Sequence, residues 1–213
     1  MQEIEDLSIG GSLKLAGPVK FKRIELAGSL TIDGSAEGKV LEISGSGKIS
    51  GEVLVESINV RGSLRIGRSC ECNELEISGS TEIGNLLKAS RLEVSGKLEA
   101  ERIEAGKVTI SGRLSAEEIR ASEITVEKNS TIRGTVSCGM LTIERRGEVK
   151  DVFANIVKVE KEADCGIIEC NEISVERHSD IKEVRYVKRT QISPEATIGK
   201  IVKIEKLSRE IPN

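Results

Sequence analysis

Apolar residues recur along the whole chain in short alternating bursts. One stretch holds three pairs of apolar or small residues, each pair separated by a single residue: Leu75 and Ile77, then Thr81 and Ile83, then Leu87 and Ala89. Alternation with a period of two predicts strands, because successive side chains of a strand point to opposite faces. The sequence therefore predicts an all-β chain.

The three-burst unit repeats at regular intervals, so that Leu41, Ile58, Leu75 and Leu92 stand at equivalent positions. Related phrases include LEISGSGKISG from Leu41, INVRGSLRIG from Ile58, LEISGSTEIG from Leu75 and LEVSGKLEAE from Leu92. This repeat predicts a single-domain parallel β-helix, or β-solenoid, with a triangular section, three short strands per turn and about twelve turns. Slight irregularity in the length of the turns favours a right-handed coil. We expect the β-helix domain to span residues 7–207, between a lead at 1–6 and a tail at 208–213.

Stacking the turns places equivalent residues above one another, about 4.8 Å apart, in columns of uniform chemistry. Two inward columns are aliphatic ladders that run through Ile24 and Leu26. A third inward column is mostly small, which we attribute to three walls converging: Val55, Cys72, Ala89, Ala105, Ala121, Cys138, Ala154, Cys170 and Val187. One outward column changes sign frequently, which suits charges on adjacent strands: Lys20, Glu37, Glu71, Lys88, Glu104 and Arg120.

A glycine recurs at one corner of seven successive turns. We expect a bend with positive φ at this corner, because glycine tolerates that conformation best. The glycines concerned are Gly11, Gly28, Gly45, Gly62, Gly79, Gly96 and Gly112. From Lys128 onward the matching corner carries Lys, Arg or Pro and one extra residue.

Composition shows how such a coil fills its interior and which functions it excludes. The 213 residues include no Trp, one Tyr and two Phe, so small and aliphatic side chains must replace aromatic ones. A net charge of -3, from 32 basic and 35 acidic residues, argues against nucleic-acid binding. No apolar run approaches the roughly 18 to 20 residues of a membrane helix. We expect a soluble, cytoplasmic protein for which direct membrane binding is doubtful.

The five cysteines are the first candidates for chemistry. Their spacing does not fit a zinc site. Cys72, Cys138 and Cys170 fall in the small inward column, and Cys70 and Cys165 fall in other inward columns. Free cysteine packs there as a small hydrophobe, and reduced thiols fit a cytoplasmic protein.

His178 is the only histidine, which excludes a metal site built from three imidazoles. Equivalent corners of neighbouring turns carry Asn129, Arg146, Glu162 and Glu195, so we interpret this corner as solvated.

Four glutamates share an outward strand column that is able in principle to bind a cation or to act as an acid–base pair: Glu25, Glu42, Glu76 and Glu93. The turns have no insertions that would build a cleft and almost no aromatic residues that would bind a sugar. We therefore interpret these glutamates as a solvated face, and we expect no catalytic site, no cofactor and no metal.

The two ends of the coil lack a neighbouring turn. Repeat proteins usually close such ends with polar caps. Here only residues 1–6 precede the first turn, and the chain from Leu207 offers little more than Pro212. We expect both ends to stack on another copy through these residues: Leu7, Ile9, Leu13 and Leu15 at one end, and Ile198, Ile201, Ile204 and Leu207 at the other.

The phrases LEISGSGKISGEV and LEISGSTEIG resemble the repeated glycine-containing segments of the bactofilins, a family of polymer-forming cytoskeletal proteins, and the resemblance covers essentially the whole chain. It implies a right-handed β-helix that self-assembles without nucleotide, through its terminal turns, into nonpolar filaments that scaffold other proteins or a membrane. The start MQEIEDLS departs from the hydrophobic membrane motif of many members. Acidic residues near the start and basic residues near the end would favour head-to-tail stacking, but we expect hydrophobic and backbone contacts to outweigh these screened charges, so that like ends meet as the resemblance implies.

A different class of function stays open. A monomeric or dimeric β-helical binding module, similar to a division-site regulator, would dock its partner on a side face. A contiguous exposed apolar patch would favour it. Leu54 and Phe153 point outward by the repeat, although single exposed apolar residues are common in proteins.

Overall fold

The computed structural model describes residues 2–212, and within that range all regular structure is β-strand. The first nine strands are β1 (Gln2–Ile9), β2 (Ser12–Ala16), β3 (Val19–Leu26), β4 (Ser29–Asp33), β5 (Ala36–Ile43), β6 (Ser46–Ile49), β7 (Val53–Val60), β8 (Ser63–Ile66) and β9 (Cys70–Ile77). The remaining strands are β10 (Ser80–Val94), β11 (Lys97–Ile110), β12 (Arg113–Val126), β13 (Thr131–Ile143), β14 (Glu148–Val159), β15 (Asp164–Val175), β16 (Asp180–Ile192) and β17 (Thr197–Lys203).

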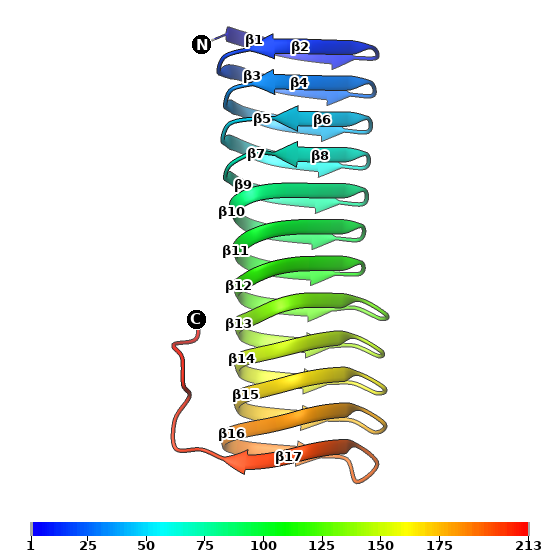
Figure 1. Cartoon of the computed structure of the whole chain (residues 1–213), viewed down its shortest axis with the longest axis vertical. Coiled ribbons are helices and arrows are strands. Elements are labelled where there is room, and N and C mark those ends of the chain that lie inside the picture. The colour runs from blue at the N-terminus through cyan, green and yellow to red at the C-terminus, as the bar shows by residue number, and fades with distance from the viewer. Residues whose placement is uncertain (1, 213) are drawn as a thin grey trace. The chain divides into compact units, whose positions relative to one another are not determined.

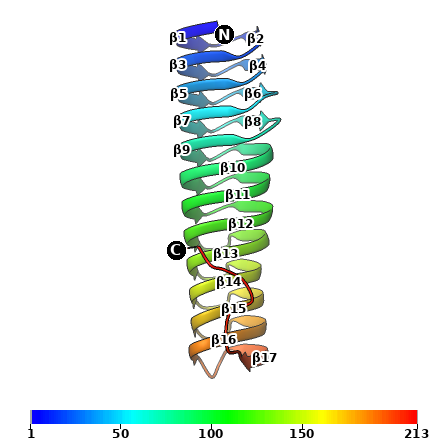
Figure 2. The same cartoon turned by 90° about the vertical axis from the view of Figure 1, so that its left-hand side faces the viewer.

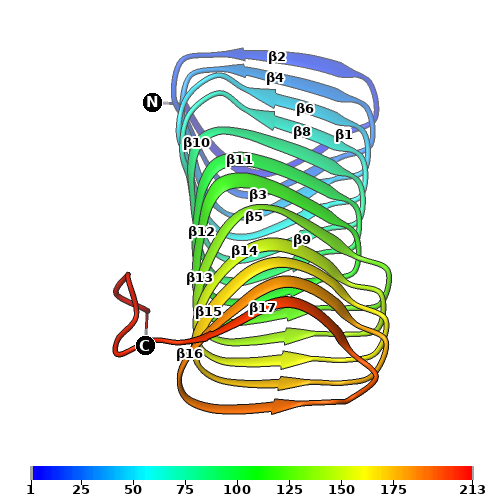
Figure 3. The same cartoon turned by 60° about the horizontal axis from the view of Figure 1, so that its bottom comes forward.

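The chain forms two compact units, unit 1 up to Ala105 and unit 2 from Gly106. In each unit the strands of successive turns lie parallel, one above the other (Figure 1). The tilted view shows how the chain goes once around in each turn and then continues into the next (Figure 3). Together the units hold about twelve turns of a β-solenoid, which confirms the predicted right-handed parallel β-helix.

Pairing between turns follows the register that the repeat predicts. In unit 1, Leu7 pairs with Ile24, and Ile24 pairs with Leu41, so these successive turns have the same length. In unit 2, Leu141 pairs with Val157, so the turn there is one residue shorter. The aliphatic columns are buried throughout the interior turns, with Ile24, Leu41 and Leu141 all 0% exposed. The alternation read from the sequence therefore marks the core directly.

The three alternating runs of a turn do not form three separate strands. The third run of one turn and the first run of the next form one strand, as in β9, where Cys70 and Cys72 precede Leu75 and Ile77. From β10 to β16 a single strand of 12 to 15 residues covers most of each turn. These strands continue through a corner, and in β13 Gly134 takes a positive φ there.

The recurring corner glycines are required for a reason that differs from the expected one. None of these glycines among the described residues has a positive φ; the described glycines that do are Gly17 and Gly134. A Cβ on Gly45 would instead lie 1.9 Å from the carbonyl oxygen of Gly28 in the preceding turn, and a Cβ on Gly62 would lie 2.0 Å from that of Gly45. The expectation of a left-handed bend was wrong, and backbone stacking at van der Waals distance selects glycine here.

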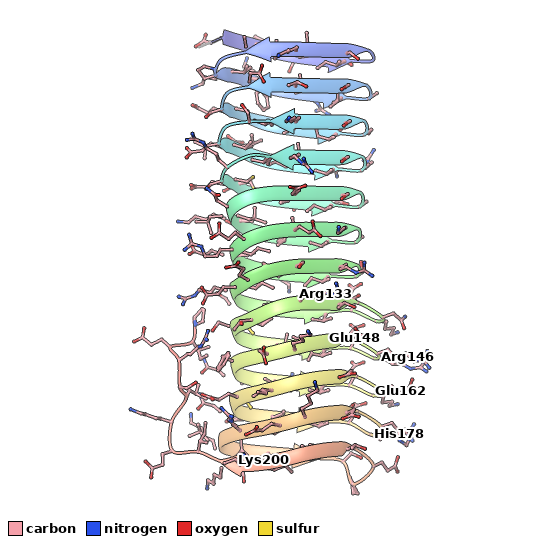
Figure 4. All side chains as sticks on the ribbon, in the orientation of Figure 1. Arg133, Arg146, Glu148, Glu162, His178 and Lys200 are labelled. Carbon is pink, nitrogen blue, oxygen red and sulfur yellow. The ribbon has the colours of Figure 1, made fainter. Side chains whose placement is uncertain are left out.

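Left-handed residues do occur at the corners of unit 2, where the repeat changes. Asn129, Arg146, Glu162 and His178 have φ between 59° and 60°, at equivalent positions of successive turns. The extra residue of these corners is accommodated by a tight bend with one left-handed residue. The bends project from the coil, as the positions of Arg146, Glu162 and His178 in Figure 4 show.

The small inward column differs at both ends from the one that the sequence predicts. It begins earlier, with Phe21 and Gly38, and Val187 is not part of it. Phe21 pairs with Gly38, and a Cβ on Gly38 would lie 2.5 Å from the Phe21 ring, so glycine makes room for the aromatic side chain. At the other end Cys170 pairs with Tyr186 and not with Val187. The register shifts by one residue after Cys170, which displaces Val187 from the column.

Candidate functional site

The first turn, formed by β1 and β2, exposes part of its apolar interior. Leu7, Leu13 and Leu15 are half-buried, and Ile9 is buried with 6% exposed. The corresponding residues of the next turn are almost completely buried, with Ile24 0%, Leu30 1% and Ile32 0% exposed. The structure therefore places the four residues predicted at this end around one terminal turn (Figure 1).

The last strand, β17, shows the same contrast. Ile198 pairs with Ile181 and Ile201 pairs with Val184. Ile181 and Val184 are 0% exposed, whereas Ile198 is half-buried and Ile201 is 50% exposed. Two of the four residues predicted at this end thus lie on the terminal strand.

The other two predicted residues at this end lie beyond β17. Ile204 is still attached to the last turn, since its backbone N–H donates a 2.9 Å hydrogen bond to the carbonyl oxygen of Tyr186. Leu207 belongs to a segment that leaves the coil. We call residues 204–212 the C-terminal strap.

The C-terminal strap runs back along the side of unit 2, from β17 to the level of β13 (Figures 1 and 2). The Ser208 backbone N–H donates a hydrogen bond to Glu169 Oε1, and the Arg209 guanidinium lies 4.5 Å from the centroid of the Phe153 ring. Farther along, a Cβ on Gly139 would lie 3.3 Å from the Pro212 carbonyl oxygen. The strap thus crosses β15, β14 and β13 in turn.

The surface under the strap is the outer side of the third run of each turn, which we call the third face. Its outward column in unit 2 contains Ser137, Phe153, Glu169 and Arg185, paired in that order. Ser137 and Glu169 are each only 2% exposed. Arg185 Nη1 lies 3.8 Å from Glu169 Oε2 and compensates part of the buried carboxylate charge. Sequence reasoning missed this arrangement, although Phe153 stood out as an aromatic residue in an outward position.

The third face of unit 1 is open and hollowed. A groove of about 610 Å³ lies on it, and its walls include these charged and apolar side chains: Glu37, Leu54, Glu56, Glu71, Lys88 and Glu104. Leu54 is 51% exposed at its floor. Lys20 pairs with Glu37 at 2.8 Å and Lys88 with Glu104 at 3.6 Å, as the sign changes of this column predict.

All five cysteines are buried with free thiols, which confirms that they pack in the core. Burial raises the pKa of Cys138, Cys165 and Cys170 to about 12. A hydrogen bond with Cys72 and burial raise the pKa of Cys70 well above its ordinary value. Within residues 2–212 no three metal-ligating side chains lie close enough to hold a metal ion together.

The corner column of unit 2 is a ladder of exposed charges. Arg146 Nε lies 2.6 Å from Glu162 Oε2, and His178 Nε2 lies 3.4 Å from Glu195 Oε2. Hydrogen bonds from Arg145 and Arg146 lower the pKa of Glu162. These contacts agree with a solvated corner for His178, because every group in them is in contact with solvent.

The four glutamates proposed as a solvated face lie along an outward strand column of unit 1. Glu25 pairs with Glu42 in register, and Glu76 pairs with Glu93. Cations from neighbouring positions reach this column, with Arg23 contacting Glu25 at 2.6 Å and Glu42 at 2.7 Å. The column is thus a charged surface whose carboxylates are partly neutralised by arginine.

Parallel coils with an aliphatic interior and a solvated, charged exterior define a structural β-solenoid. Residues 66–153 match the family model of the bactofilins, described as polymer-forming cytoskeletal proteins. This match confirms the resemblance over that segment.

Among solved structures, the C-terminal domain of the Caldicellulosiruptor hydrothermalis tapirin is similar, with 11% identity and a TM-score of 0.41. The alignment covers 100% of this chain and 64% of that domain, so the chain spans less than two thirds of its length. A search of curated proteins finds no match. The described part of the chain contains no helix long and apolar enough to cross a membrane.

Proposed function

We propose that the protein is a non-enzymatic, cytoplasmic subunit that assembles end to end into filaments without nucleotide and scaffolds other proteins. Assembly would bring β1 and β2 of one copy, or β17, against a terminal turn of another copy. Each such contact would cover the apolar columns, and a junction of unlike ends would also continue the parallel pairing.

One observation carries this proposal. Between Ile24 and Val175 the aliphatic columns through Ile24 and Leu26 are at most 4% exposed. At the ends of the coil, by contrast, Ile201 is 50% exposed and four other residues are half-buried: Leu7, Leu13, Leu15 and Ile198. A neighbouring turn of similar sequence would bury them as completely as Ile24 or Val184. Burying apolar area contributes about 25 cal/mol per Å², and the description of the matched family as polymer-forming points to the same outcome.

The test is electron microscopy with sedimentation velocity, over a range of protein and salt concentrations and without nucleotide. We expect filaments from the natural sequence and no filaments from Leu7→Arg or Ile201→Arg, because an arginine at the junction would be buried without a partner. Ile156→Arg is a matched control, since Ile156 is 36% exposed on a side of unit 2. Filaments that form equally well from both end variants would overturn the proposal.

The polarity of the filament follows from the same two variants. If like ends meet, Leu7→Arg leaves dimers joined at β17, and Ile201→Arg leaves dimers joined at β1 and β2. If unlike ends meet, either variant leaves only single subunits, because every junction then needs both ends.

A further inference from the structure

The third faces of the two units carry equivalent residues at equivalent positions. Phe153 precedes Glu169 by one turn in unit 2, and Leu54 precedes Glu71 by one turn in unit 1. Phe153 and Leu54 each stand four residues before the start of a repeat, at Val157 and Ile58. An outward apolar side chain followed by a glutamate one turn later therefore occurs twice.

Only one of these two pairs is covered. Arg209 lies over Phe153, and the Ser208 backbone N–H satisfies the carboxylate of Glu169, whose side chain is 2% exposed. Leu54 is 51% exposed, and Glu71 is exposed as well. The strap thus shows what kind of segment this pair of residues accepts: a segment without regular structure, bent at Ser208 and Arg209, with the arginine over the apolar residue and a backbone N–H toward the glutamate.

The charge of the groove fits such a segment. Its walls hold four glutamates and one lysine. The strap carries Lys206 and Arg209 against Glu205 and Glu210, so its net charge is zero and the complementarity rests on where Arg209 lies. Arg209, placed over Leu54, would also reach the neighbourhood of Glu37 and Glu56, which line the groove beside Leu54. Attraction between Arg209 and these glutamates would fix the register of the segment.

We propose that the groove on the third face of unit 1 binds the C-terminal strap of a second copy of the chain. The strap would use the same two residues as in its own unit 2, with the Ser208 N–H directed to Glu71 and Arg209 directed to Leu54. Exchange of one segment between copies is an economical way to join two molecules, because the segment's contacts need little change. The contact is lateral, and it is independent of the end-to-end junctions proposed above.

The first experiment titrates a fluorescent peptide of residues 206–212, KLSREIP, into the full chain and follows fluorescence anisotropy. The chain carries Leu7→Arg so that filaments do not complicate the titration. We expect saturable binding at one site, weakened at least tenfold by Leu54→Glu or Glu71→Lys. We expect equal binding by Ile156→Glu, a matched control on another exposed side chain. An Arg209→Glu peptide should bind at least tenfold more weakly, and added salt should weaken the natural peptide.

Two results of this titration would overturn the proposal. One is the lack of saturable binding to the natural groove. The other is binding that survives Leu54→Glu but is lost in Phe153→Glu, because the peptide would then be displacing the strap from unit 2. Circular dichroism of each variant separates a lost site from a lost fold.

The second experiment asks whether two copies use the groove. In the Leu7→Arg, Ile201→Arg double variant, sedimentation velocity should detect a dimer that forms at high concentration and that Leu54→Glu abolishes. A double variant that stays a single subunit at every concentration contradicts the lateral contact. The end-to-end proposal is judged separately, from filaments of the natural sequence, so the two failures are distinguishable.

Discussion

The close spacing between turns restricts which single residues can stand at one corner of this protein. Gly28, Gly45 and Gly62 lie so close to the corner of the preceding turn that a Cβ would meet a backbone carbonyl oxygen at 1.9 to 2.0 Å. That oxygen belongs to the stacked backbone and has no rotamer with which to move away. The corner glycines are therefore a packing requirement of the coil rather than a φ requirement.

Gly45→Ala should lower the free energy of unfolding by about 3 kcal/mol, the upper part of the range for overpacking a rigid site. Gly11→Ala is the matched control. Gly11 stands at the same corner of the first turn, where a Cβ would meet nothing within 4 Å. Urea unfolding of both variants measures the difference, and equal loss in the two would contradict the stacking argument.

Buried thiols give the fold a dependence on alkaline pH. The pKa of Cys165 is raised from an ordinary value near 9 to about 12 by burial. Above pH 9 the unfolded chain releases the thiol proton and the folded chain keeps it, so stability is complete below pH 9 and falls between pH 9 and about pH 12. The slope is about 1.4 kcal/mol per pH unit for each such thiol.

Unfolding in urea with a reducing agent, at pH 7, 8 and 10, measures this slope. Cys165→Val should reduce the slope by the contribution of one thiol, because valine does not ionise. Valine should be tolerated there, since Cys165 stands between Val149 and Ile181 in an apolar column. A variant with the same pH dependence as the natural chain would show that Cys165 ionises in the folded state.

At the scale of elements, the corners of the two units solve one problem in two ways. Unit 1 turns its corner with a stacked glycine, whereas the turns of unit 2 from Lys128 onward use one more residue and a left-handed conformation at Asn129, Arg146, Glu162 and His178. A non-glycine residue in that conformation costs on the order of 1 kcal/mol, and a β-branched residue costs more. The extra residue thus replaces a packing constraint with a conformational one.

His178→Val should destabilise unit 2 by about 1 to 2 kcal/mol, because a β-branched side chain resists a φ of 60°. His178→Gly should not share this loss, since glycine adopts positive φ freely. Glu195→Val is the matched control, as Glu195 occupies the equivalent corner of the next turn and is not among the left-handed residues of the described chain. Thermal unfolding ranks the three variants, and similar losses at positions 178 and 195 would remove the conformational explanation.

At the scale of the whole molecule, stability comes from neighbouring turns within each unit. In a repeat protein each turn contacts only the turns beside it, so the terminal turns have half the support of the interior ones. In the terminal turns Leu13 and Ile201 are partly exposed, whereas in the interior turns Leu41 and Leu141 are completely buried. The same contrast links the stability of the subunit to its proposed assembly.

Hydrogen exchange measured by mass spectrometry should reflect this difference. Amides of β1, β2 and β17 should exchange fastest among the strands of the subunit, and those of β5 and β14 should exchange slowest. On assembly, protection should rise in the terminal strands and stay unchanged in the interior ones. Protection that rises on the third face of unit 1 and not at the terminal turns would favour lateral association over end-to-end stacking.

Much of this protein follows from its sequence alone. The alternation of Leu75 with Ile77 and its return at Leu92 determine the strands, the length of the turn and the pairing between turns. This works because each turn meets its nearest copy in the sequence, so that the repeat itself specifies the contacts. The outward charges of Lys20 and Glu37, one turn apart, pair for the same reason.

Only the tertiary structure decided which part of the surface the C-terminal strap covers. Ser208 contacts Glu169, which lies more than two turns earlier in the sequence, and Arg209 contacts Phe153, which lies still farther away. The repeat encodes neither contact, because it specifies only contacts between adjacent turns. The same holds for the corner glycines, because the distance between stacked backbones is a property of the packed coil. Local alternation therefore determined the core, and contacts between unlike segments decided which surface is covered and which is open.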